Sequence, residues 1–191
     1  MERRDTEKDF VTAFWKLYAV KPIEKISINQ LCQSAGYNRA TFYNHFENIY
    51  ALLDKAVDSI FIPVKEKVLS KYDIRSLLQG DIIETTLLTY FSSNNIYIEL
   101  LFKRQNYYLL SEKIKKELFY KIKNEFNDNS INFDMIKILL EYQISAILGV
   151  ISYWYQQGKS ISEQDILKKI YSISSKGVLN SLRDEISSGQ K

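Results

Sequence analysis

Residues 26–46, ISINQLCQSAGYNRATFYNHF, decide the fold of this chain. Ser27 stands where the N-cap of a short helix is expected, directly before an apolar residue. Gly36 comes just after that helix, as a left-handed cap does, and Asn38 is placed to cap a second short helix. Two short helices joined by a turn at Gly36 describe a helix-turn-helix.

The second short helix has an inward and an outward face. Leu31, Ala35 and Phe42 are predicted to face inward and to fix the angle at which the two helices cross. The other face presents a guanidinium, an amide, hydroxyls and an imidazole between residues 39 and 45. These groups suit the base edges and phosphates of double-stranded DNA, so we predict a recognition helix.

Contacts to the DNA backbone are expected from polar groups on both helices. Tyr43 and Thr41 can donate to phosphate oxygens, which fixes the register without reading sequence. Ser27 and Asn29 lie at the start of the first helix, where free backbone N–H groups also bind phosphate. His45 is expected to hydrogen-bond a phosphate.

Base readout is expected from the same recognition helix. Arg39 is predicted to read a guanine, because a bidentate arginine–guanine pair discriminates by about 1–3 kcal/mol. Asn44 can read an adenine edge, and Ala40 can pack on a thymine methyl group. The alternative is that these exposed polar side chains are only solvated. The predicted DNA-binding residues are Ser27, Asn29, Asn38, Arg39, Ala40, Thr41, Tyr43, Asn44 and His45.

The run from Gly36 through residues 39–46, RATFYNHF, resembles the recognition-helix signature of the tetracycline-repressor (TetR) family of bacterial transcriptional regulators. The match is specific, because a helix-turn-helix alone does not demand Phe-Tyr-x-His-Phe before the next helix. It covers about the first 55 residues. The resemblance implies a homodimer whose C-terminal helices form the dimer interface and often an effector pocket.

Two positions depart from the family's pattern. Ile49 stands where members often carry a lysine that touches a phosphate. Tyr37 stands where a small aliphatic residue is usual. Two alternatives follow: this phosphate contact is missing, or Tyr50 or Lys55 supplies it.

Composition extends the helical fold class to the whole chain. The 191 residues include six glycines and two prolines, too few turn residues for a many-stranded sandwich or barrel. Apolar residues recur at helical spacing in about nine stretches. We therefore predict an all-α protein, with a three-helix helix-turn-helix DNA-binding domain over residues 1–53 and a C-terminal helical bundle for regulation and dimerisation over residues 54–191.

Aromatic residues are frequent in the C-terminal part of the chain. They can line a cavity for a small hydrophobic or aromatic effector, with phenol groups orienting the ligand. The alternative is that they fill the core of a helical domain. The predicted pocket residues are Tyr90, Phe102, Tyr107, Phe119, Tyr142 and Trp154.

The last two helices are predicted to form the dimer interface. Small residues at helical spacing on the final helix let a partner helix come close, and the preceding helix is strongly apolar. Together they can form half of a four-helix bundle across a two-fold axis. The alternative is an interior packing face. The predicted interface residues are Ile144, Ile147, Ile151, Ile170, Ser174, Gly177 and Ser181.

Composition also limits the chemistry and the compartment. A single cysteine, Cys32, excludes an intramolecular disulfide and a multi-cysteine zinc site. The sequence shows no nucleophile motif, glycine-rich phosphate loop or metal cluster, so we expect no enzyme, cofactor or metal. No apolar signal-peptide core follows the charged residues 1–9, and the apolar window 144–155 is too short for a bilayer of about 30 Å. We expect a cytoplasmic protein with no membrane partner.

These features predict a transcriptional regulator that acts as a repressor. It binds a palindromic operator in double-stranded DNA as a homodimer and is released by a small-molecule effector. The alternative is a DNA-binding dimer whose C-terminal domain binds a protein partner or only dimerises. A helical enzyme that shares the motif is a third reading, disfavoured because the motif already explains the one histidine and the one cysteine.

Overall fold

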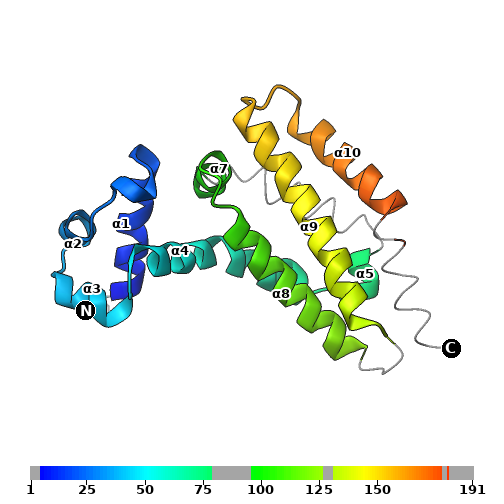
Figure 1. The fold of residues 1–191 in the computed structure, drawn as a ribbon, viewed down its shortest axis with the longest axis horizontal. Helices are drawn as coiled ribbons and strands as arrows, with labels where there is room; N and C mark the ends of the chain where they lie inside the picture. Colours follow the sequence, from blue (N-terminus) through cyan, green and yellow to red (C-terminus); the bar gives the residue numbers. More distant parts are fainter. Residues whose placement is uncertain (1–4, 79–95, 127–130, 178–179, 181–191) are drawn as a thin grey trace. The chain divides into compact units, whose positions relative to one another are not determined.

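The computed structural model describes residues 5–78, 96–126, 131–177 and 180, and these ranges contain helices and no strand (Figure 1). The all-α prediction is confirmed. Two predicted site residues, Tyr90 and Ser181, lie outside the described ranges. The elements are α1 (Thr6–Val20), a short 3-10 helix (Ile23–Lys25), α2 (Ile28–Ala35), α3 (Arg39–His45), α4 (Ile49–Val64), a π-helical segment (Lys65–Leu69), α5 (Ile74–Leu78), α7 (Ile96–Lys103), α8 (Tyr108–Glu125), α9 (Phe133–Gln156) and α10 (Glu163–Lys176).

The chain divides into two compact units, Met1–Ile60 and Phe61–Lys191. Helix α4 begins in the first unit and continues into the second. Pro63 lies inside the last turn of α4, where it lacks the N–H that an α-helix needs. The chain continues as a π-helical segment, in which the Ser70 N–H donates to the Lys65 carbonyl oxygen at 2.8 Å. The predicted functional boundary at residues 53 and 54 stays a prediction.

The N-terminal unit has an aromatic core. Phe10, Phe14 and Tyr18 recur along α1 at helical spacing, and all three are fully buried. The Phe14 and Tyr18 rings stack with their centres 5.1 Å apart. Leu31 of α2 and Leu52 of α4 are also fully buried, so each helix contributes its apolar stripe to one core.

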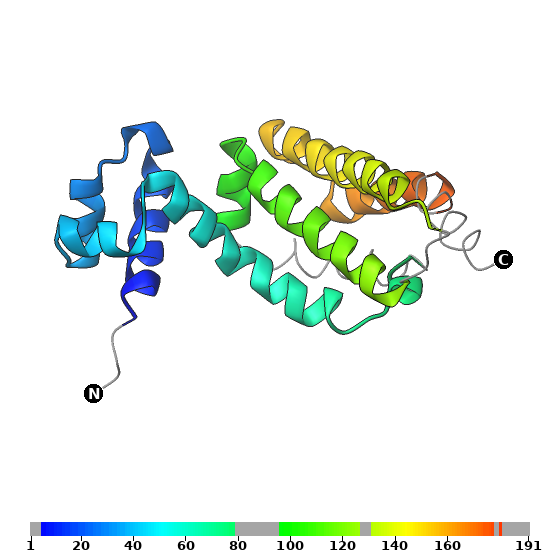
Figure 2. The same cartoon turned by 60° about the horizontal axis from the view of Figure 1, so that its bottom comes forward.

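The C-terminal unit is a helical bundle in which α9 packs against α7 and α8 (Figures 1 and 2). Phe102 of α7 is fully buried between two rings, with its centre 5.4 Å from Tyr107 and 5.4 Å from Tyr155. Burial raises the pKa of Tyr155 to about 12. Trp154 is buried beside it, and its indole N–H donates to the Ile161 carbonyl oxygen at 2.8 Å.

Helix α9 is long and apolar enough, by length and composition alone, to cross a membrane. The apolar window 144–155 lies within this 24-residue helix, which begins at Phe133. One face of the helix, which includes Ile136 and Ile151, is buried within the C-terminal unit. That face packs as the core helix of a bundle does.

Candidate nucleic-acid interface

A side-chain cap begins the first helix of the helix-turn-helix, and a glycine in the left-handed conformation ends it. The Ser27 hydroxyl oxygen accepts from the Gln30 backbone N–H at 3.3 Å, and the Gln30 amide oxygen accepts from the Ser27 N–H at 3.1 Å. This reciprocal pair is a capping box that satisfies two otherwise unpaired donors. Gly36 ends the helix at φ +78°, as the left-handed cap predicts. Asn29, in the first turn of α2, is exposed.

Aromatic packing holds the second helix, α3, in place. Phe42 is fully buried, and its ring meets that of Phe10 edge to face with the centres 5.4 Å apart. Phe46 closes the cluster, 5.6 Å from Phe42 and 5.9 Å from Phe10. Because these side chains fix one face of α3 to α1, the opposite face is directed away from the core.

The outward face of α3 carries most of the predicted contact residues. Arg39, Ala40 and Asn44 are exposed. Tyr43 is 48% exposed, a large fraction for an aromatic residue on a short helix. The Arg39 guanidinium lies along Tyr43, with its carbon 5.9 Å from the ring centre and one nitrogen 3.5 Å from the phenol oxygen. The structure therefore brings the predicted guanine reader and a predicted phosphate donor together on one edge.

Asn38 and Thr41 act within the helix-turn-helix as capping groups. The Asn38 amide oxygen accepts from the Thr41 backbone N–H at 2.8 Å and from the Thr41 hydroxyl at 3.0 Å. Thr41 is half-buried, and its hydroxyl proton is committed to Asn38. A phosphate contact by Thr41 therefore requires its hydroxyl to turn away from Asn38.

His45, at the end of α3, is directed toward a neighbouring helix. Its Nδ1 lies 3.5 Å from a carboxylate oxygen of Glu7 in α1, and the other Glu7 oxygen accepts from the Lys55 ammonium at 2.8 Å. The hydrogen bond from Lys55 is the main cause that lowers the pKa of Glu7, and the same bond raises the pKa of Lys55. His45 therefore keeps only Nε2 for a phosphate. Sequence reasoning missed this trio, because Glu7 lies far from His45 in the chain.

The first departure from the family's pattern has a local explanation. The Tyr37 hydroxyl donates to the Asp9 carboxylate at 2.8 Å, and its ring centre lies 5.3 Å from that of Phe10. A larger residue is accommodated at this position because it packs on α1 and gains a hydrogen-bond partner there.

The second departure is Ile49, which stands in place of the usual phosphate-binding lysine. Of the two residues named as substitutes for that contact, one remains available. Asn48 caps α4, and its side-chain oxygen accepts from the Tyr50 and Ala51 backbone N–H groups at 2.9 and 3.0 Å. Lys55 is paired with Glu7. Tyr50 is 54% exposed in the first turn of α4, where helix N–H groups favour an anion.

Comparisons with known proteins agree with this arrangement. Residues 11–56 match the family profile described as bacterial regulatory proteins, tetR family, and residues 82–176 match the profile described as transcriptional regulator C-terminal region. The chain belongs to the TetR family. It is a TetR-family transcription regulator with a helix-turn-helix DNA-binding domain.

A solved structure shows the same fold at low sequence identity. A tetR-family transcriptional regulator from Streptomyces coelicolor superposes with a TM-score of 0.60 over 98% of this chain and 87% of that chain, at 13% identity. The structure of RolR without ligand gives a TM-score of 0.46 over 91% of this chain and 96% of that chain, at 14% identity. A search of curated proteins found no match.

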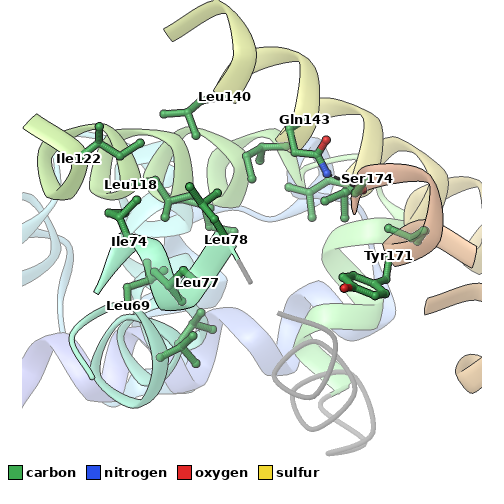
Figure 3. Close-up of a pocket in the computed structure, with 17 residues that line it drawn as sticks. Leu69, Ile74, Leu77, Leu78, Leu118, Ile122, Leu140, Gln143, Tyr171 and Ser174 are labelled. Atoms are coloured by element: carbon green, nitrogen blue, oxygen red, sulfur yellow. Dashed lines mark hydrogen bonds between the residues drawn. The ribbon is translucent and has the colours of Figure 1, made fainter. Parts of the chain in front are cut away.

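The C-terminal unit of this TetR-family regulator contains a cavity of about 170 Å³ (Figure 3). Its described walls come from the end of α4, the π-helical segment, α5, α8, α9 and α10. Aliphatic side chains dominate the lining. Gln143, Tyr171 and Ser174 bring the amide and hydroxyl groups seen in Figure 3.

The aromatic residues predicted for an effector pocket are placed elsewhere. None of the five within the described ranges lines this cavity. Phe102 and Trp154 are core residues, and Phe119 packs edge to face on Phe133 at 6.2 Å. Tyr107 borders a separate polar recess beside α9. Tyr142 is 64% exposed.

The residues predicted for the dimer interface also lie mostly inside the protomer. Ile144, Ile147, Ile170 and Ser174 line the cavity. Ile151 is 1% exposed, and Gly177 is exposed at the end of α10.

Sequence reasoning missed two features of this unit. Gln143 continues the buried stripe of α9 at helical spacing, so a polar residue inside an apolar stripe was the available signal. The other feature is an exposed apolar stripe on α9, which we call the α9 stripe. Its members are Met135, Ile138, Tyr142, Val150 and Tyr153.

Proposed function

We propose that this regulator is a repressor that binds a palindromic operator as a homodimer and is released when a small molecule occupies its C-terminal unit. The exposed Arg39–Tyr43 edge of α3, fixed from behind by Phe42, is the observation that carries the proposal. A preorganised helix presents its side chains to the major groove without first having to order them.

The contacts on DNA follow from the chemistry of each group. Arg39 offers a planar pair of donors to a guanine, and the neighbouring Tyr43 hydroxyl donates to a phosphate. Asn44 and Ala40 face an adenine edge and a thymine methyl group from the same exposed face. Tyr50, at the start of α4, takes the phosphate contact that the family's usual lysine makes.

The α9 stripe supports the proposal of a homodimer. Apolar side chains exposed at helical spacing along one helix mark an interaction site. The partner's identical stripe covers them in a two-fold symmetric contact. Two recognition helices then meet successive major grooves about 34–36 Å apart, or a multiple of that distance. The interface residues predicted in the sequence analysis, four of which line the cavity, stay a prediction.

The cavity favours effector control over the alternative in which the C-terminal unit only dimerises or binds a protein. A solidly packed unit would have left no space for a ligand. A ligand shifts this regulator away from DNA only by as much as it prefers one conformation over the other.

The decisive experiment measures operator binding by fluorescence anisotropy, with DNA selected from a random pool by the wild-type protein. We expect Arg39→Ala to weaken binding roughly 5- to 150-fold, as the loss of an arginine–guanine pair does. Tyr43→Phe should weaken it about 2- to 10-fold, by the loss of one hydrogen bond. Tyr120→Phe, at an exposed tyrosine on α8, is the matched control. Unchanged affinity in both α3 variants would refute the proposal.

A further inference from the structure

The cavity in the C-terminal unit is mainly aliphatic, with one aromatic residue, Tyr171, and it is uncharged. Leucine, isoleucine and valine side chains make up most of the lining, and no Asp, Glu, Lys, Arg or His occurs among the described residues that form it. An ion that entered would lose its hydration and find no opposite charge, so the cavity discriminates against charged ligands.

One pair of polar side chains crosses the cavity wall from α9 to α10 (Figure 3). Gln143 is more than nine-tenths buried, and its amide nitrogen donates to the Ser174 hydroxyl oxygen at 2.5 Å. An amide carries a second N–H and a carbonyl oxygen, and the serine hydroxyl keeps its own proton to donate. The pair therefore has unused capacity to give and to accept hydrogen bonds with a ligand.

The volume limits the size of that ligand. A dry apolar cavity of about 150 Å³ admits benzene. The cavity here is slightly larger, at about 170 Å³. It suits an aromatic or aliphatic ring that carries two or three further heavy atoms.

We propose that the cavity binds a neutral, mainly apolar molecule of about nine non-hydrogen atoms, whose one hydroxyl or carbonyl group hydrogen-bonds to Gln143 and Ser174. This proposal rests on the proposed function in one respect only, namely that the bound molecule is the effector that releases the operator. Binding to the cavity is a property of the protein without DNA and can be measured alone.

Four probes of one skeleton and similar size separate the contributions of charge and hydrogen bonding. They are para-methylbenzyl alcohol, the hydrocarbon para-ethyltoluene, the cation para-methylbenzylammonium and the anion para-methylbenzoate. Titration calorimetry of the full-length protein without DNA should rank the alcohol first and the hydrocarbon second. The alcohol should bind at least about tenfold more tightly than either ion. Equal affinity for an ion, or no binding of the alcohol at about 1 mM, would overturn the proposal.

Variants test the role of the polar pair. Gln143→Leu keeps the volume and apolar character of the wall, so it should bind the hydrocarbon as the wild type does. The preference for the alcohol over the hydrocarbon should fall below about twofold. Ser174→Ala gives a second, smaller change at the same pair. Gln156→Leu, a glutamine of α9 outside the cavity lining, is the matched control and should keep the preference. A preference that survives in both cavity variants would overturn the assignment.

The outcomes separate this proposal from the proposed function. Alcohol binding that depends on Gln143 but leaves operator affinity unchanged supports the ligand site and counts against effector release. Operator binding without any binding of the alcohol supports the DNA-binding role and counts against this ligand class.

Discussion

Replacing Phe42 with alanine should separate folding of the N-terminal unit from folding of the rest. Phe42 is fully buried and contacts three other rings, so its loss leaves a cavity that neighbouring side chains fill only in part. A buried Phe→Ala change costs about 3–5 kcal/mol. The unit Met1–Ile60 is small. At about 0.05–0.15 kcal/mol per residue, its whole stability is about 3–9 kcal/mol.

The substitution therefore removes much or all of the stability of this unit, and operator binding should be lost with it. Phe42→Leu preserves most of the volume and should cost only about 1–2 kcal/mol, so this variant should bind at 25 °C and melt earlier. Circular dichroism with urea titration measures the loss of helix, and anisotropy measures binding. Phe102→Ala, equally buried but in the other unit, is the control and should spare helix α3. Full helicity and full operator affinity in Phe42→Ala would refute the reasoning.

Three further predictions concern other contacts. Tyr37→Phe removes the hydrogen bond to Asp9 while keeping the ring, so it should lower the free energy of unfolding by about 1 kcal/mol in urea titration; no change would show the bond is dispensable. Lys55 lowers the pKa of Glu7 in the folded state. The ion pair therefore stabilises the protein at pH values above the ordinary glutamate pKa of 4.5, and this stabilisation is lost as the pH falls through the lowered pKa. Glu7→Gln should thus be less stable than the wild type at pH 7 and equal to it in acid; a pH-independent difference would contradict this. Ile138→Glu buries a charge in the proposed dimer contact and should yield monomers in sedimentation, whereas a surviving dimer would place the interface elsewhere.

The helix-turn-helix was predictable because its determinants are local. Ser27, Gly36 and Asn38 act on backbone groups within three or four residues, so their roles follow from spacing alone. Phe42 faces the core as the pattern of its own helix predicts. His45 was not predictable in the same way, since the orientation of its ring depends on Glu7, which only the packing of two helices brings near.

The C-terminal unit shows why composition did not locate a pocket. Aromatic side chains bury large areas, so they are the strongest candidates for a core as well as for a binding site. Phe102 is stacked between two rings, whereas the cavity is bounded mainly by aliphatic residues that are indistinguishable in sequence from any core. Interior and exposed stripes of α9 are both apolar, and only the packing of α7 and α8 shows which is which.

A limit on the effector follows from the size of the cavity. About nine non-hydrogen atoms at a ceiling of about 1.5 kcal/mol each give at most about 13 kcal/mol of binding. Moving a two-state equilibrium from 1:99 to 99:1 requires about 5.5 kcal/mol of preference for one state. About two fifths of the ceiling must therefore be preference for one state. A ligand this small can act as a full switch only if it loses a large share of its contacts in the operator-bound conformation. By reciprocity, saturating operator DNA should weaken binding of para-methylbenzyl alcohol by the factor by which the alcohol weakens operator binding. Titration calorimetry with and without operator measures that factor, and equal alcohol affinities would show that the cavity is not coupled to DNA binding.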